Sequence, residues 1–154
     1  MPTTIYVDAD ACPVKDEIVR VAERRAIPVI FVSNRGIRVG DHPLLRSVLV
    51  AQGPDAADDW IAQAVGPADI VITADVPLAA RCVASGAVAL APNGNLFDDT
   101  SIGMAVAMRD LMTGLRDGGA ITGGPPPFAQ RDRSLFLDAL ERVCRTSHRD
   151  GQRS

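Results

Sequence analysis

Aspartate side chains recur where predicted strands of this 154-residue chain end, an arrangement that could bind a divalent cation. The sets are Asp8 with Asp10, then Asp55, Asp58 and Asp59, and finally Asp75. In an open parallel sheet the carboxyl ends of the strands share one edge, and ligands bind there. Carboxylates held close together repel one another unless a cation compensates their charge, and oxygen ligands suit Mg²⁺ or Mn²⁺. The sequence therefore predicts an acidic metal site at that edge.

A simpler role is open for several of these aspartates, because Asp is also a favoured helix N-cap residue. Asp55, Asp59 and Asp75 each stand near the start of a predicted helix and could act only as caps. Asp8 and Asp10 precede the same helix, so only one of them can be a simple cap. The cluster as a whole therefore favours a metal site more strongly than any single member does.

Strands and helices alternate along the part of the chain that carries these residues. Short apolar runs predict strands at residues 4–7, 28–32, 47–51, 69–73 and 87–91. Helical periodicity predicts helices at residues 13–25, 55–65 and 75–85. This order predicts an α/β fold with three layers and a mostly parallel five-stranded sheet. Because the strands are continuous apolar runs, we expect helices on both faces of the sheet.

The second half of the chain predicts a C-terminal helical extension. A helix capped by Asp98 or Asp99 runs through Leu115, and a last helix carries one apolar stripe: Phe136, Leu140, Val143 and Cys144. We expect one domain over residues 1–146 and a polar, frayed tail over residues 147–154. The first of these two helices leaves room for a homodimer through its apolar side chains, which are Met104, Met108, Leu111, Met112 and Leu115.

Composition excludes several classes of protein. The formal net charge is −3, from 16 basic and 19 acidic residues, so a strongly basic nucleic-acid footprint is absent, although a local basic patch stays open. The three cysteines form no CxxC motif, and with only two histidines a zinc site is not expected. No apolar run approaches the ~20 residues that span a bilayer, and the start has no signal-peptide pattern. We expect a cytoplasmic protein without a membrane partner.

The first strand also allows a second chemistry. The sequence Asp8-Ala9-Asp10 after an apolar strand resembles the first motif of haloacid-dehalogenase-type phosphatases, in which the first Asp attacks phosphorus. The run at residues 70–73 resembles their second motif, an apolar strand that ends in Ser or Thr. Those enzymes normally use a lysine downstream of that motif, whereas Lys15 is the only lysine here, so Arg81 would have to substitute. The alternative function is a phosphomonoesterase with Asp8 as the nucleophile.

A larger set of motifs, from about residue 5 to residue 140, resembles the YaiI/YqxD family of uncharacterised bacterial proteins. The motifs are DADACPV at residues 8–14, SNR at 33–35, the acidic helix start at 55–61, DIVITADVPLA at 69–79 and TGGP at 122–125. That family is similar to PIN-like nuclease domains, which cut phosphodiesters with Mg²⁺ or Mn²⁺ held by acidic residues after successive strands. The resemblance implies a PIN-like domain and a metal-dependent phosphodiesterase, or nuclease, acting on RNA or DNA.

The resemblance also implies roles for individual residues. Asp8 matches the acid of the first strand, Asp75 the acid after the fourth strand, and Asp58 is preferred among the acids that open the middle helix. Asp10 takes the place of a fourth acid, for which Glu17 is the alternative. The predicted catalytic residues are Asp8, Asp10, Asp58 and Asp75, and the predicted ligands of Mg²⁺ or Mn²⁺ are Asp8, Asp58, Asp59 and Asp75.

Polar residues after the second strand are candidates for substrate contacts. We predict that Ser33, Asn34, Arg35 and Arg38 bind phosphate groups, because they follow the carboxyl end of a strand. The same loop region also holds His42 and Arg46. Ser-Asn-Arg-Gly equally fits plain turn chemistry. A further alternative is therefore a domain without catalysis that binds nucleic acid or a protein partner.

Two other features have more than one interpretation. Cys12 precedes a predicted helix, whose dipole can lower the pKa of a thiol, although a small packed residue is the favoured role. Residues 123–127, Gly-Gly-Pro-Pro-Pro, could form a rigid wall or an anion-binding nest.

Overall fold

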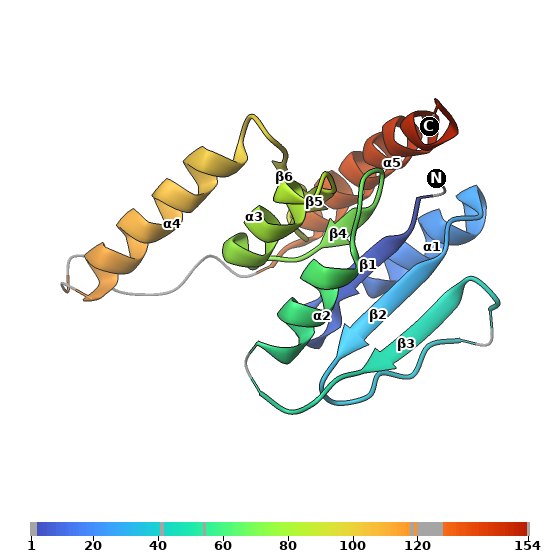
Figure 1. The fold of residues 1–154 in the computed structure, drawn as a ribbon, viewed down its shortest axis with the longest axis horizontal. Helices are drawn as coiled ribbons and strands as arrows, with labels where there is room; N and C mark the ends of the chain where they lie inside the picture. Colours follow the sequence, from blue (N-terminus) through green and yellow to red (C-terminus); the bar gives the residue numbers. More distant parts are fainter. Residues whose placement is uncertain (1–2, 41, 54, 118, 120–127, 154) are drawn as a thin grey trace.

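One six-stranded sheet organises the chain in a computed structural model that describes residues 3–40, 42–53, 55–117, 119 and 128–153 (Figure 1). The strands are β1 (Ile5–Asp8), β2 (Val29–Ser33), β3 (Leu45–Leu49), β4 (Ile70–Ile72), β5 (Val88–Leu90) and β6 (Leu96–Phe97). The helices are the short 3-10 helix η1 (Ala9–Ala11), α1 (Lys15–Arg25), α2 (Ala56–Ala64), α3 (Val76–Ala84), α4 (Ile102–Asp117) and α5 (Gln130–Arg153). The α/β class is therefore confirmed.

Strand order places β1 at the centre of the sheet. The order is β3-β2-β1-β4-β5-β6, and every pair is parallel except β5 with β6. The chain builds β2 and β3 on one side of β1 and then returns to place β4 on its other side. The carboxyl ends of β1 and β4 therefore border the point where the strand order reverses, which is where open α/β sheets bind ligands.

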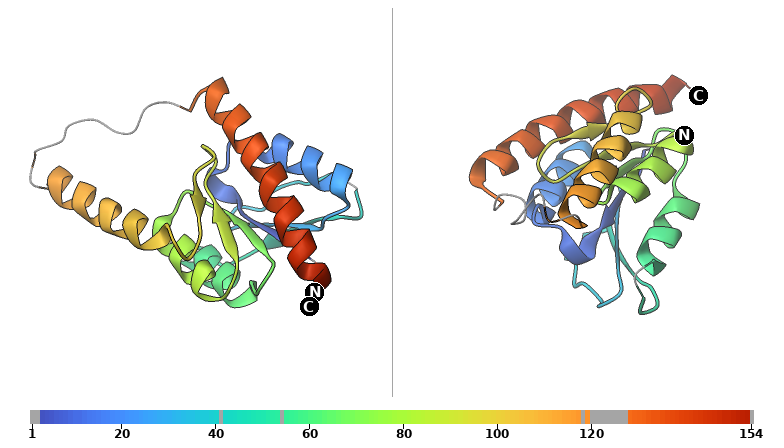
Figure 2. Two further views of the ribbon diagram at one scale, coloured as in Figure 1. Left: turned by 90° about the horizontal axis from the view of Figure 1, so that it is seen from above. Right: turned by 90° about the vertical axis from the view of Figure 1, so that its left-hand side faces the viewer.

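Helices cover both faces of the sheet, as the continuous apolar strands predicted. Figure 1 shows α2 and α3 in front of the sheet and α1 and α5 behind it. Alternate residues of each strand serve the two cores: Ile5 and Val7 of β1 belong to the core under α1 and α5, whereas Tyr6 belongs to the core under α2 and α3. The start of α4 packs on α3, and the helix then extends away from the sheet (Figure 2).

Helix α5 is tied to the rest of the fold through its residues 133–144. Phe136 and Leu140 are fully buried against the sheet, which confirms the predicted apolar stripe. Glu141 of α5 forms ion pairs with Arg24 and Arg25 at the end of α1. Close packing also requires Gly94, with φ +94°, because a Cβ there would lie 2.9 Å from the carbonyl carbon of Leu135. The C-terminal helix is thus an integral layer of the domain.

The structure differs from the sequence-based prediction in several details. The sheet has six strands instead of five, because the two-residue β6 pairs antiparallel with β5 at the sheet edge. The third strand begins at Leu45, two residues before the predicted start. Helix α5 continues to Arg153 and so includes residues assigned to a frayed tail. The Gly-Gly-Pro-Pro-Pro segment, residues 123–127, lies outside the described residues.

None of the helices in the described part of the chain is both long enough and apolar enough to span a membrane.

Candidate active site

Asp8 and Thr73 meet where the strand order reverses. Asp8 is the last residue of β1, and Thr73 directly follows β4. The Thr73 hydroxyl accepts a hydrogen bond from the Asp75 backbone amide and donates one to Asp8 Oδ2, both over 3.0 Å. A hydroxyl has one proton to donate. Because Thr73 accepts from the amide, that proton is directed at Asp8 and fixes the orientation of its carboxylate.

A cleft of about 330 Å³ opens beside this pair. Its lining consists of Asp8, Cys12, Ile72, Thr73, Ala74, Asp75 and Pro92. Cys12 follows η1, and the other residues come from the ends of β1, β4 and β5 or directly follow them, so the cleft lies at the carboxyl edge of the sheet. Its floor is buried, since Thr73 is only 2% exposed. Thr73 and Pro92 had no predicted role in a metal site, and their positions at the end of one predicted strand and directly after another were the signal that could have identified them.

Asp75 combines the two roles that the sequence left open. Its Oδ1 accepts a hydrogen bond from the Leu78 amide over 3.0 Å, so the side chain caps α3. Among the described residues, no hydrogen bond engages Oδ2, and the residue is exposed at the cleft. The cap therefore orients the carboxylate and leaves one oxygen for another partner.

Asp58 joins Asp8 and Asp75 electrostatically. It lies in the first turn of α2 and is half-buried. Burial raises the pKa of Asp58 to about 6, and the negative charges of Asp75, Asp8 and Asp55 contribute to the rise. Burial also raises the pKa of Asp8, an effect that the Thr73 hydrogen bond opposes and the charges of Asp75 and Asp10 reinforce. Three of the predicted aspartates thus form one cluster of mutually repelling carboxylates.

Asp10 holds a loop in place beside the cluster. Its Oδ2 accepts a hydrogen bond from the Asn34 amide over 3.0 Å, and the Arg35 guanidinium Nε lies 3.8 Å from Oδ1. Ser33 is fully buried, and its hydroxyl accepts a hydrogen bond from the Gly36 amide. These contacts tie the end of β1 to the loop after β2. Ser33 thus serves as a turn residue, whereas Asn34 and Arg35 stand at the edge of the site.

Several other candidates have partners away from the cluster. Asp59 forms an ion pair with Arg81 over 2.9 Å, both being exposed. Glu17, the alternative fourth acid, pairs with Arg133 of α5. Arg38 and His42 line a separate cavity on the α1 side of the sheet. Arg46 lies in β3, opposite Ile30, and its charge acts on the Tyr6 hydroxyl. The loop after β2 therefore does not form one continuous basic patch.

Cys12 lines the cleft but is not an activated thiol. It is 9% exposed, and burial raises the pKa of its thiol despite the nearby Lys15 ammonium group. The thiol is also separated from the start of α1, which begins at Lys15. The packed role is thus the one that the geometry supports.

The chemistry of the cluster suits a hard divalent cation. All its donors are carboxylate or hydroxyl oxygens, which Mg²⁺ and Mn²⁺ prefer. Within the described ranges, no three His, Cys, Asp or Glu side chains converge closely enough to form a complete metal cage. Mg²⁺ does not require one, because it retains several waters and is held by one or two carboxylates together with substrate phosphates. One oxygen of Asp10, Oδ1, is also buried and has no hydrogen-bond partner among the residues that the structure describes.

Comparisons with known proteins agree over almost the whole chain. The family model described as "Uncharacterized BCR, YaiI/YqxD family" matches residues 6–146. A UPF0178 protein of Rhodopseudomonas palustris strain HaA2 is 62% identical over 144 residues, which cover 94% of this chain and 88% of the relative. A UPF0178 protein of Nitrobacter winogradskyi is 58% identical over 145 residues, covering 94% and 92%. No solved structure matches the chain, so the similarity to PIN-like domains stays a prediction.

Proposed function

Because the chain belongs to the YaiI/YqxD family, whose description names no activity, we propose its function from the site itself: divalent-metal-dependent hydrolysis of phosphodiester bonds in RNA or DNA. The observation that carries the proposal is the cluster of Asp8, Asp58 and Asp75 beside a cleft at the carboxyl edge of the sheet. Their mutual repulsion destabilises the fold unless a cation is bound. A functional role accounts for keeping such a cluster, because catalytic sites concentrate carboxylates with shifted pKa values.

The residues of the site have separate roles in this mechanism. Asp8 and Asp75, which line the cleft, would hold Mg²⁺ or Mn²⁺, and the nearby charge of Asp58 would add to the attraction; the ion when bound lowers the pKa of a water and neutralises charge on the phosphate. Thr73 fixes Asp8 through its hydroxyl, and the cap at the start of α3 fixes Asp75. Asn34 and Arg35 lie next to the cluster through Asp10, and the Arg35 side chain is 75% exposed. Arg35 would therefore contact a phosphate of the polyanionic substrate.

Cleavage of labelled oligonucleotides tests the proposal. Single-stranded and double-stranded RNA and DNA are incubated with the purified protein and Mn²⁺, with Mg²⁺, or with EDTA. We expect hydrolysis of at least one substrate with Mn²⁺ and none with EDTA. The absence of cleavage in every arm, together with no heat of Mn²⁺ binding at millimolar concentration, would contradict the proposal. That result would favour a domain that binds nucleic acid or protein without catalysis.

The raised pKa of Asp58 predicts an unusual dependence of stability on pH. Between an unfolded pKa of 3.8 and a folded pKa of about 6, the folded protein holds more protons, so stability falls as pH rises through this window. In EDTA, Asp58→Asn is therefore expected to raise the free energy of unfolding at pH 7 by about 1 kcal/mol. This gain is smaller than the full pKa difference would give, because solvent screens the charge of a half-buried side chain. At pH 3.5 the gain should disappear.

Urea denaturation at both pH values checks this prediction. Asp59→Asn is the matched control, because Asp59 is the adjacent residue, is exposed and pairs with Arg81. The control should not gain stability at pH 7. If Asp58→Asn has the same effect on stability at both pH values, burial and the neighbouring carboxylates do not raise the pKa of Asp58 in the folded protein, and the electrostatic argument for its part in the cluster is wrong.

One contact favours the alternative phosphomonoesterase. The Thr73 hydroxyl donates to Asp8, so the polar residues that end the two resembled motifs lie side by side. The lysine they use is not at this pair, however, since Lys15 Nζ donates to the Cys12 carbonyl and lines the cavity on the α1 side. The candidate substitute, Arg81, is paired with Asp59. Beryllofluoride separates the two functions, because only a nucleophilic Asp8 forms a stable adduct with it.

A further inference from the structure

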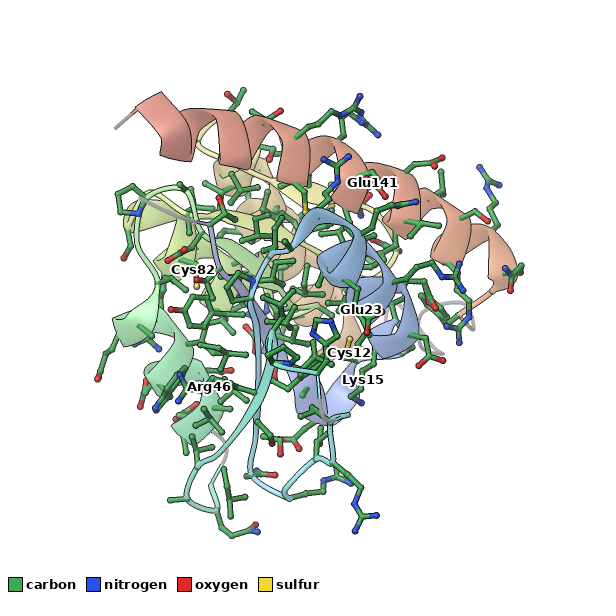
Figure 3. All side chains as sticks on the ribbon, turned by 90° about the vertical axis from the view of Figure 1, so that its right-hand side faces the viewer. Cys12, Lys15, Glu23, Arg46, Cys82 and Glu141 are labelled. Atoms are coloured by element: carbon green, nitrogen blue, oxygen red, sulfur yellow. The ribbon has the colours of Figure 1, made fainter. Side chains whose placement is uncertain are left out.

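A second and larger cavity lies behind the sheet, next to the loop that Asp10 holds. This α1 basin has a volume of about 760 Å³ and is lined by side chains of α1 between residues 15 and 23, by residue 31 of β2, and by residues 37–40, 42 and 45. Its volume lies within the range of about 300–1,000 Å³ that is typical of small-molecule sites. Figure 3 shows Lys15 and Glu23 on the side of α1 that borders β2 and β3. The function proposed above does not use this cavity.

The floor of the α1 basin is apolar. It consists of side chains that also pack against the core behind the sheet: Val19, Phe31, Ile37, Val39 and Leu45. Phe31 and Leu45 are buried, whereas Val19, Ile37 and Val39 are partly exposed. Such a floor favours an apolar group of a ligand, because covering it removes apolar surface from water.

Cations without carboxylate partners surround this floor. Lys15, Arg20 and Arg38 line the basin, and within the described part of the chain none of them forms an ion pair. The neighbouring Arg24 and Arg25, by contrast, are paired with Glu141. Unpaired guanidinium and ammonium groups beside one cavity are suited to a phosphate group.

Three further polar side chains of the basin, His42, Asp16 and Glu23, can form hydrogen bonds with ligand groups other than a phosphate. His42 Nδ1 accepts from the Leu44 amide over 3.1 Å, so a neutral His42 carries its proton on Nε2 and is a donor there. Asp16 and Glu23 also line the basin and can accept from hydroxyl or amino groups. The site thus offers an apolar floor, cations, and acceptors around one cavity.

We propose that the α1 basin binds a nucleotide. A nucleotide has a flat ring for the apolar floor, a phosphate for the three cations, and sugar hydroxyl or amino donors for Asp16 and Glu23. The bound unit is a free nucleoside monophosphate or one unit of a longer strand. Binding of one unit of a longer strand rests on the proposed function. The positions of the basin and the acidic cleft suit such a strand. Lys15, which lines the basin, donates to the carbonyl of Cys12 over 3.3 Å, and Cys12 lines the acidic cleft, so the two cavities are neighbours along this segment.

Calorimetric titration with the four 5′-ribonucleoside monophosphates, in EDTA, tests the proposal. We expect at least one to bind, and Arg38→Ala to weaken its binding by about tenfold, because a charge-assisted contact to phosphate is lost. Arg109→Ala is the matched control, since Arg109 is an exposed arginine on α4 away from the basin. Ribose 5-phosphate should bind more weakly than the nucleotide, because it has no ring for the floor.

Each result either distinguishes a free nucleotide from a unit of a longer strand as the ligand, or overturns the proposal. No binding of any monophosphate or of a short oligonucleotide to the intact protein would overturn it, as would equal weakening by Arg109→Ala or equal affinity for ribose 5-phosphate. Binding of the oligonucleotide to Asp8→Asn, lost in Arg38→Ala, identifies a strand as the source. Because binding is measured in EDTA, nucleotide affinity without any Mn²⁺-dependent cleavage would reject only the proposed hydrolysis, and cleavage without nucleotide binding would reject only this site.

Discussion

Replacing Asp8 with Asn is expected to lower Mn²⁺-dependent phosphodiester hydrolysis by about a thousandfold without unfolding the protein. A bound cation contributes several kcal/mol of transition-state stabilisation, and each 1.36 kcal/mol corresponds to a tenfold change in rate. Asp8 is at the centre of the cluster, since it contacts Thr73 directly and its charge acts on Asp58. An asparagine keeps a carbonyl oxygen for the Thr73 hydroxyl and removes only the negative charge.

The control for this variant is Asp138→Asn, on an exposed position of α5. The two substitutions change the net charge equally, so a difference between them reports on position and not on total charge. Initial rates with Mn²⁺ give the comparison, and circular dichroism checks that both variants fold. If Asp8→Asn keeps more than about a tenth of the wild-type rate, hydrolysis takes place elsewhere and the proposed role of the cluster is wrong.

The sequence was sufficient to place the carboxylate cluster because strand ends can be predicted from short apolar runs. Asp8, Asp75 and the group of Asp55, Asp58 and Asp59 were selected for their positions after strands or at a helix start, Asp58 was preferred in that group through the family resemblance, and the parallel sheet brings these positions to one edge. The sequence could not show which aspartates have other partners. Asp59 differs from Asp58 by one position on α2, which turns it by about 100° toward Arg81.

Local patterns also limited the prediction of the fold. The strand β6 has only two residues, Leu96 and Phe97, which is too short for a periodicity to be recognised. The loop after β2 was expected to direct its basic residues to one site. Instead, Arg35 stays with Asp10, Arg38 lines the α1 basin, and Arg46 lies in β3. Arg46 faces away from the basin because alternate positions of a strand face opposite sides of the sheet, and the preceding residue of β3, Leu45, lines the basin.

Of the substitutions proposed here, Phe136→Ala is expected to lower the free energy of unfolding most. Phe136 is fully buried in α5, in the same core as Ile5 and Ile70 at the centre of the sheet. Truncating a buried phenylalanine costs about 3–5 kcal/mol, through lost burial and the cavity that remains. Domains of this size have a total stability of about 5–15 kcal/mol, so this one change removes a large part of it.

Urea denaturation followed by circular dichroism measures the loss, with Leu135→Ala as the matched control. Leu135 is the preceding residue of α5 and is 45% exposed, so its truncation should cost less than about 1 kcal/mol. A helix that only extends an independent domain would show small effects in both variants. Two separate unfolding transitions would lead to the same conclusion, because an appended helix can detach before the sheet unfolds.

A large, single-transition effect would also link the C-terminal helix to the candidate active site. Arg133 of α5 donates to the Pro13 carbonyl over 2.7 Å and to the Glu17 carboxylate over 3.2 Å. Pro13 directly follows Cys12, which lines the acidic cleft. The burial of Phe136, one turn along the same helix, keeps Arg133 in place. Phe136→Ala should therefore weaken Mn²⁺ binding under conditions where the variant is still folded, whereas Leu135→Ala should leave it unchanged.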